Sequence, residues 1–205
     1  MSTGPKLRLA LIGWGAIART VAGLLRETPV EIVAVAVRDA SAPRADLPPS
    51  ARLITDPDEL DATRPDVVAE AAGRESVAPW GRAALDAGAD FIVSSASAFA
   101  DAQLLETLRE VARRNDAQIT IQPGALGGVE ALAAARVMGI DAVEHRIVKP
   151  PRAWQDTPAA TLCDLAALTG PEIIFTGTAA EAASRFPKNA NVAMTTALAG
   201  IGPDD

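Results

Sequence analysis

Aromatic side chains, cysteine and histidine are scarce in this chain of 205 residues. Aromatic residues make up 3% of it, with no tyrosine, and there is one cysteine and one histidine. The lone Cys163 excludes a disulfide framework and a cysteine-based metal cluster, and one histidine adds no set of zinc ligands. We therefore expect no metal site. Because Cys163 lies in the apolar run 161–168, we interpret it as a core residue.

Long apolar runs and clustered positive charges are missing as well. Hydrophobic residues make up 49% of the chain, but no run approaches the roughly 18 apolar residues that span a bilayer. The first residues, Met1–Lys6, lack the apolar centre of a signal peptide. A formal net charge of −7 without a basic stripe argues against nucleic acid. We expect a soluble, cytoplasmic protein with neither a nucleic-acid nor a membrane partner.

A glycine loop near the N-terminus carries the clearest chemical signal. The apolar run Leu7–Ile12 leads into Gly13-x-Gly15-x-x-Ala18 and then into a helix-like pattern. Gly13 allows a sharp turn, Gly15 leaves room for a pyrophosphate, and small Ala18 lets the helix approach the strand. Free N–H groups at the helix start can bind phosphate oxygens. The candidate cofactor contacts in this loop are Gly13, Gly15, Ala16 and Ile17.

The next hundred residues alternate between strand-like and helix-like patterns. This spacing predicts an α/β fold with a doubly wound parallel sheet of Rossmann type. We expect Ile17, Val21, Leu24 and Leu25 to form the buried side of the first helix, and Asp56 to cap a helix before Pro57. The predicted strands after the glycine loop are 31–37, 52–54, 66–70, 90–93 and 118–121, and the later helices are 76–87 and 101–115.

The second predicted strand ends at Arg38-Asp39, where Rossmann folds bind the adenosine ribose. An acid there accepts a hydrogen bond from the 2′-hydroxyl of NAD, whereas an arginine pairs with the 2′-phosphate of NADP. Both residue types are present, so the cofactor is NAD or NADP, with Arg38 as a candidate contact. The alternative is that Arg38 and Asp39 form an ordinary solvated strand end.

From Gly124 the pattern changes, which indicates a second domain. We predict a dinucleotide-binding domain over 1–123 and a smaller α/β domain with an open mixed sheet over 124–205. An open sheet face with Ile173 and Phe175 would be too apolar to leave in water, so we expect a homodimer. The alternative is that further C-terminal elements cover this face. The predicted elements of this domain are helices 127–137 and 189–199 and strands 143–148 and 172–178.

Several strings together resemble the motifs of one family, the L-aspartate dehydrogenases. These are NAD(P)-dependent enzymes with a Rossmann domain and a mixed α/β catalytic domain, and the resemblance covers nearly the whole chain. The last three strings are the most specific, because a generic Rossmann protein has no reason to carry them. The matching strings are 13–17, 94–101, 123–132, 149–152 and 186–193.

The resemblance implies that the protein oxidises L-aspartate to iminoaspartate, which water converts to oxaloacetate and ammonia or which supplies NAD biosynthesis. It also implies that Ala125 and Asn191 contact the cofactor, with Ser95 in the loop after the fifth strand as a further candidate. An asparagine amide can donate to and accept from the ribose hydroxyls or the carboxamide. The alternative role of Asn189 and Asn191 is helix capping.

Cations are needed to hold the two carboxylates of such a substrate. The candidates are Lys149, Arg152 and Lys188, with Asn189 beside them. The family's catalytic histidine would lie beyond Asp205, so we expect a C-terminally truncated sequence in which the catalytic base is unknown. His145 does not match the catalytic motif, and we interpret it as a structural residue on the predicted strand 143–148.

Two other functions remain open. One is a different two-domain NAD(P) oxidoreductase that acts on a small carboxylate or a sugar. Such enzymes usually carry a Lys-Pro motif after the fifth strand, where this chain has Ser94–Ala98. The other is a non-catalytic nucleotide-binding protein, which the missing catalytic base favours.

Overall fold

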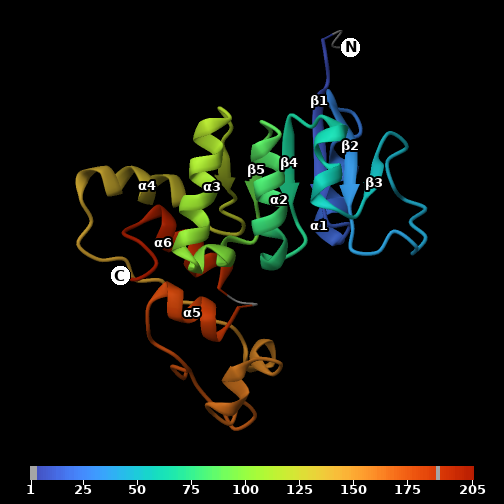
Figure 1. Cartoon of the computed structure of the whole chain (residues 1–205). Coiled ribbons are helices and arrows are strands. Elements are labelled where there is room, and N and C mark those ends of the chain that lie inside the picture. Colours follow the sequence, from blue (N-terminus) through green and yellow to red (C-terminus); the bar gives the residue numbers. More distant parts are fainter. Residues whose placement is uncertain (1–3, 188–189) are drawn as a thin grey trace. The chain divides into compact units, whose positions relative to one another are not determined.

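The first of two compact units of the chain is built on a six-stranded sheet. The computed structural model describes residues 4–187 and 190–205, and its units comprise residues 1–122 and 123–205. The sheet has the order β3-β2-β1-β4-β5-β6, and all neighbouring strands are parallel (Figure 1). The strands are β1 Leu7–Ile12, β2 Val30–Ala36, β3 Arg52–Ile54, β4 Val67–Glu70, β5 Asp90–Val93 and β6 Ile119–Ile121.

The strand order confirms the predicted doubly wound fold. The chain leaves β1 toward β2 and β3, and then returns to the other side of β1 with β4. Helices α2 (Arg74–Asp86) and α3 (Ala102–Arg114) pack side by side (Figure 1). Helix α1 (Ala16–Leu24) connects β1 to β2, and this connection moves across the sheet in the opposite direction from those through α2 and α3. Because such crossovers between parallel strands are right-handed, α1 lies on the opposite face of the sheet.

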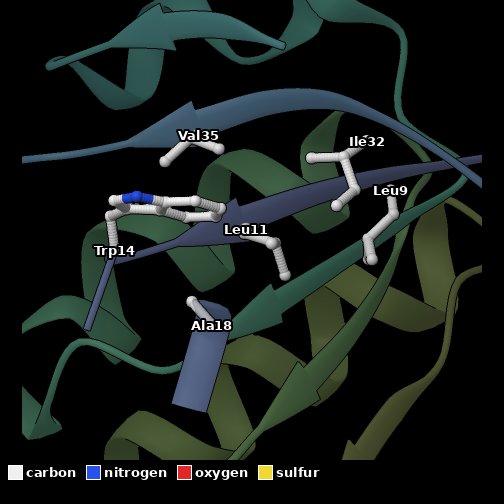
Figure 2. Packing of buried hydrophobic residues seen from close by; sticks show 6 residues of the cluster. All are labelled: Leu9, Leu11, Trp14, Ala18, Ile32 and Val35. Atoms are coloured by element: carbon white, nitrogen blue, oxygen red, sulfur yellow. The ribbon is translucent and has the colours of Figure 1, made fainter. Parts of the chain in front are cut away.

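An apolar cluster fills the space between the sheet and α1. Leu9 and Leu11 of β1 meet Ile32 and Val35 of β2, and Trp14 and Ala18 complete the cluster (Figure 2). Residues three apart on a regular strand face opposite sides. The register of β1 against β2 shifts between Leu9 and Ala10, which pair with Ile32 and Ala34. This irregularity turns both Ile32 and Val35 toward α1.

The apolar side expected for α1 is narrower than the sequence suggests. Ala18 is fully buried, and Val21 and Leu25 pack against the cluster. Ile17 and Leu24, predicted on the same side, are 60% and 75% exposed. Because the small Ala18 brings the helix axis close to the sheet, only a thin strip of the helix surface reaches the core.

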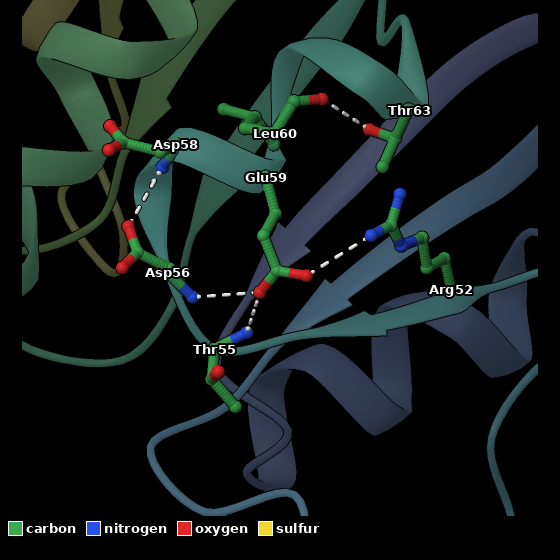
Figure 3. Close-up of polar contacts among 7 residues, drawn as sticks. All are labelled: Arg52, Thr55, Asp56, Asp58, Glu59, Leu60 and Thr63. Carbon is green, nitrogen blue, oxygen red and sulfur yellow. Dashed lines mark hydrogen bonds and ion pairs between the residues drawn. The ribbon is translucent and has the colours of Figure 1, made fainter.

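Two short 3-10 helices replace the helix predicted after Asp56. They are η1 (Pro57–Glu59) and η2 (Asp61–Thr63). The predicted cap is present: Asp56 accepts a hydrogen bond from the amide of Asp58, and Glu59 accepts from the amides of Thr55 and Asp56 (Figure 3). Arg52 on the edge strand donates to the other oxygen of Glu59. Arg64, with φ 46°, then ends the helical run.

The second unit is helical where a mixed sheet was predicted. Its described residues, 123–187 and 190–205, contain no strand, so the prediction of strands at 143–148 and 172–178 is wrong for this structure. Exposure still alternates along 143–148, with residues 143, 145 and 147 half-buried. An extended segment becomes a strand only when a neighbour pairs with its backbone. The helices are α4 Val129–Met138, η4 Pro151–Trp154, η5 Pro158–Thr161, α5 Ala179–Arg185 and α6 Asn191–Ala199.

The segment around Cys163 also differs from its prediction. The helix-like run 161–168 forms only the end of η5 and turns, in which Asp164 accepts hydrogen bonds from the amides of Ala166 and Ala167. Cys163 is half-buried and does not fill a core. Among the described residues no helix is both long and apolar enough to cross a membrane.

Replacing Gly81 by alanine should destabilise the first unit. A Cβ at this position of α2 would lie 2.7 Å from Cε1 of Phe91 and 3.2 Å from Cδ1 of Leu108, and such overpacking costs about 1–3 kcal/mol. Gly23→Ala in α1 is the matched control, because a Cβ there meets nothing within 4 Å and alanine gains up to ~1 kcal/mol of helix propensity. Urea denaturation measures both; equal losses of stability would contradict this packing.

Candidate functional site

The glycine loop lies against the segment that follows β4. Gly13 has φ 94°, and a Cβ there would lie 2.9 Å from the carbonyl oxygen of Ala71 and 3.0 Å from Cα of Ala72. The Gly13 amide donates to the carbonyl of Ala36, and the Ala71 amide donates to that of Ile12. Backbone therefore meets backbone at the carboxyl ends of β1, β2 and β4, and only glycine fits.

Gly15 starts α1 and leaves its N-terminus open. It is the N-cap residue, with φ −86°, and a Cβ on it would meet nothing within 4 Å. Within the described part of the chain, no side chain caps this helix, and its first turn holds no acidic residue. The first amides of a helix have no intrahelical acceptor. The amides of Ala16 and Ile17 can therefore receive the oxygens of a phosphate group.

Trp14 anchors the loop from its other side. Its indole packs against Val35 (Figure 2), and its Nε1 donates a 3.0 Å hydrogen bond to the carboxylate of Asp46. Arg19 of α1 also contacts Asp46, at 3.1 Å. The hydrogen bond from Trp14, aided by the charge of Arg19, lowers the pKa of Asp46. Asp46 is not among the residues predicted from the sequence, because it lies in a proline-rich loop without a motif.

Arg38 and Asp39, the two charged residues predicted to lie near the adenosine ribose, follow directly after β2. Asp39 accepts hydrogen bonds from the amide of Ser41 at 2.8 Å and from its hydroxyl at 2.6 Å, which lower the pKa of Asp39. Arg44 donates to the carbonyl of Asp39 and so lies at the same turn as the exposed Arg38. Arg44 is therefore a second cation near the predicted ribose site, and it was not among the residues predicted from the sequence.

Ser95 lies after β5 and is buried beneath the same edge of the sheet. Its amide and its hydroxyl both donate to the carboxylate of Glu70, at 3.0 Å each. Glu70 is the last residue of β4 and is 1% exposed. The sequence predicts that Ser95 lies in a loop, but it does not predict the contact with Glu70, because the pattern identifies Glu70 only as a strand residue.

Ala125 and Asn191 belong to the second unit. Ala125 is exposed in the loop before α4, where Gly124 and Gly128 have φ of 61° and 76°. Asn191 is the first residue of α6, and its N-cap is Ala190. Asn191 therefore lies one residue past the N-cap position of the helix. Lys188 and Asn189 lie outside the described residues.

An aromatic cluster joins two of the three specific motifs of the second unit, 149–152 and 186–193. Nζ of Lys149 lies 5.4 Å from the ring centre of Trp154, which in turn makes an edge contact of 5.9 Å with Phe186. Phe186 also contacts Phe175 at 5.5 Å. The Lys149–Arg152 segment is thus packed against the segment that leads into α6, with Arg152 exposed.

His145 is held by α6. Its Nδ1 lies 2.8 Å from the hydroxyl of Thr196, and the residue is half-buried. This contact agrees with a structural role.

The candidate residues divide between the two units. The first unit gathers Gly13, Gly15, Ala16, Ile17, Arg38 and Ser95 at the carboxyl ends of its strands, and the second unit carries Ala125, Lys149, Arg152 and Asn191.

Family models match both parts of the chain. Residues 13–122 match the model described as "Homoserine dehydrogenase, NAD binding domain", and residues 130–205 match "Aspartate dehydrogenase, C-terminal". The first match begins at Gly13 and ends just after β6. The glycine loop and strands β2–β6 therefore correspond to a known NAD-binding domain, and β1 lies immediately before the matched residues.

Curated relatives cover nearly the whole chain. It is 53% identical over 198 residues to the L-aspartate dehydrogenase of Brucella anthropi, which covers 96% of this chain and 74% of that protein. It is 44% identical to that of Ralstonia pickettii, with 96% and 75% covered. The crystal structure of aspartate dehydrogenase from Thermotoga maritima matches 94% of this chain and 73% of that one, with a TM-score of 0.70 and 24% identity. This structure supports the fold.

Alanine substitutions at the two loop glycines should have different effects, one on stability and the other on cofactor binding. Gly13→Ala forces a Cβ against Ala71 and Ala72 at positive φ, which should destabilise the first unit by about 1–3 kcal/mol. Gly15→Ala has open space, so the fold should keep its stability while the methyl group obstructs the pyrophosphate. We expect a roughly tenfold weaker NADH affinity, or ~1.4 kcal/mol. Thermal denaturation and NADH fluorescence titration measure these effects; unchanged NADH affinity in Gly15→Ala would contradict the assignment.

Proposed function

Because the chain belongs to the L-aspartate dehydrogenase family, we propose that it oxidises L-aspartate to iminoaspartate and transfers the hydride to NAD or NADP. Each turnover releases one proton and one reduced cofactor. Water then converts the imine to oxaloacetate and ammonia. The observation that carries this proposal is the 53% identity to one such enzyme over 96% of the chain, which spans both units.

In this proposal the first unit holds the adenosine and pyrophosphate groups of the cofactor. Gly13 and Gly15 let the backbone approach the pyrophosphate, and the open amides of α1 at Ala16 and Ile17 bind its oxygens. Arg38 lies beside the ribose at the end of β2. The nicotinamide of the bound cofactor would supply the redox chemistry, and the protein supplies binding, orientation and electrostatics.

The second unit carries the remaining candidates. In this proposal Asn191 and Ala125 contact the cofactor, as the family motifs imply, and Lys149 and Arg152 are candidates for the substrate carboxylates. Lys188 and Asn189 remain candidates from the sequence. The contact of Lys149 with Trp154 supports the role of this cation, because it fixes the position of the ammonium group. We assign no catalytic role to His145, which is engaged with Thr196.

We further propose that the protein is a cytoplasmic homodimer whose iminoaspartate supplies NAD biosynthesis. A lone cysteine is typical of the reducing cytoplasm. Large apolar side chains at the surface of the second unit support a subunit contact, among them Val137, Met138 and Ile173, the last 81% exposed. Light scattering at micromolar concentration should give twice the mass of the chain, which is 21.1 kDa. A mass equal to that of one chain would contradict the dimer.

The activity is tested by following nicotinamide absorbance with L-aspartate and each cofactor. We expect reduction of NAD or NADP with L-aspartate and none with D-aspartate or L-glutamate, because D-aspartate has the opposite configuration at Cα and L-glutamate has one more methylene between its two carboxylates. Stronger reduction with another amino acid would contradict the substrate. Binding of NADH without turnover would contradict catalysis by these 205 residues and leave only the cofactor-binding part of the proposal standing.

A further inference from the structure

A buried carboxylate lies at the carboxyl end of β4. Glu70 is 1% exposed and ends a strand at the centre of the sheet, next to β1. Transferring a charged carboxylate from water to a protein interior is costly unless donors surround it. The structure provides such donors from two separate loops. An apolar residue would fill the same space without them, so burial alone does not explain the presence of glutamate here.

The two carboxylate oxygens tie these loops together. Oε1 accepts hydrogen bonds from the amides of Ala72 and Gly73, at 2.8 and 2.7 Å, and from the hydroxyls of Ser76 and Ser95. Oε2 accepts from the amides of Ser94 and Ser95, at 3.3 and 3.0 Å. One side chain therefore fixes the backbone of the turn after β4 and of the turn after β5.

These turns lie where a Rossmann sheet receives the second half of a dinucleotide. The strand order reverses between β1 and β4, and ligands bind in the crevice outside the carboxyl ends at such a point. The half built from β1–β3 takes the adenosine nucleotide, which leaves β4–β6 for the nicotinamide nucleotide. The turn that Glu70 holds also touches the glycine loop, because Ala71 and Ala72 pack on Gly13.

We propose that Glu70 is a positioning residue for the nicotinamide half of the cofactor site. Its carboxylate fixes Ser95 and the turn 71–73 in the shape that receives the nicotinamide ribose. It does not contact the reacting atoms. This inference rests on the proposed function only in requiring that the cofactor is NAD or NADP, and it is independent of the substrate.

The variant Glu70→Gln tests the proposal. An amide has nearly the same volume but turns one acceptor into a donor, which then faces N–H groups. The matched control is Asp66→Asn, immediately before the first residue of β4 and therefore at the other end of the same strand. Its carboxylate also accepts from a backbone amide, that of Arg8 at 2.7 Å, but at the amino edge of the sheet. Binding of NADH and of ADP is measured for each protein without aspartate.

We expect Glu70→Gln to weaken NADH binding at least tenfold and to change ADP binding less than twofold, since ADP occupies only the adenosine half. Asp66→Asn should leave both affinities within twofold of the wild type. Equal weakening of NADH and ADP by Glu70→Gln would show a general structural role and overturn the proposal, as would unchanged NADH binding or a wild type that binds no NADH.

A second variant keeps the test decisive if Glu70→Gln does not fold. Ser76→Ala removes one hydroxyl donor to Glu70, at 3.2 Å, and Ser76 is not among the predicted cofactor contacts. It should weaken NADH several-fold and spare ADP; equal affinities for NADH in this variant and the wild type would then overturn the proposal. If the wild type binds NADH but does not oxidise L-aspartate, the substrate assignment fails while the role of Glu70 is still measured.

Discussion

A charged carboxylate inside a sheet must be surrounded by hydrogen-bond donors, and the cofactor edge of this protein is organised by that constraint at Glu70. Its donors come from the turns after β4 and β5. The first of these turns then presses on the glycine loop, where Gly13 leaves no space for a side chain. Three loops from separate parts of the sequence are therefore held at one edge of the sheet by a buried charge and a close backbone contact.

This arrangement divides the work of binding among the loops. The glycine loop offers free amides to phosphates because Gly15 leaves the start of α1 open. Trp14 fixes that loop through a hydrogen bond to Asp46, and this bond lowers the pKa of the Asp46 carboxyl. The turn at Ser95 is fixed by Glu70. Each loop thus carries its own anchor in the sheet or in a neighbouring loop, and a bound dinucleotide would meet a preformed surface.

The parts of the fold that depend on local patterns could be predicted from the sequence. The glycine loop and the run of β2 are recognisable within a few residues, and the structure confirms the alternation of strands and helices. The role of Glu70 could not be predicted in this way, because its donors Ser94 and Ser95 lie far along the chain. The exposure of Ile17 could not be predicted either, since it depends on how closely α1 approaches the sheet.

In the second unit, the sequence predicted strands that the described residues do not form. Alternation along 143–148 is real in the exposure of the side chains, but a strand also needs a backbone partner, and periodicity carries no information about one. Helix α5 was missed although the capping box of Thr178 and Glu181 is a local signal that could have identified it. The assignments of Ala125 and Asn191 came from family motifs, and neither spacing nor composition would have selected them.

Binding of the cofactor at the carboxyl edge of the sheet is tested most directly by heteronuclear NMR, which measures the shifts of the backbone amides when NADH is added. The account predicts that the largest shifts occur at the amides of the glycine loop 13–18, the turn 71–73 and Ser94–Ser95, all at the carboxyl edge of the sheet. If these amides are unchanged while those at the amino edge, near Arg8 and Asp90, shift, the cofactor binds elsewhere and the account is contradicted.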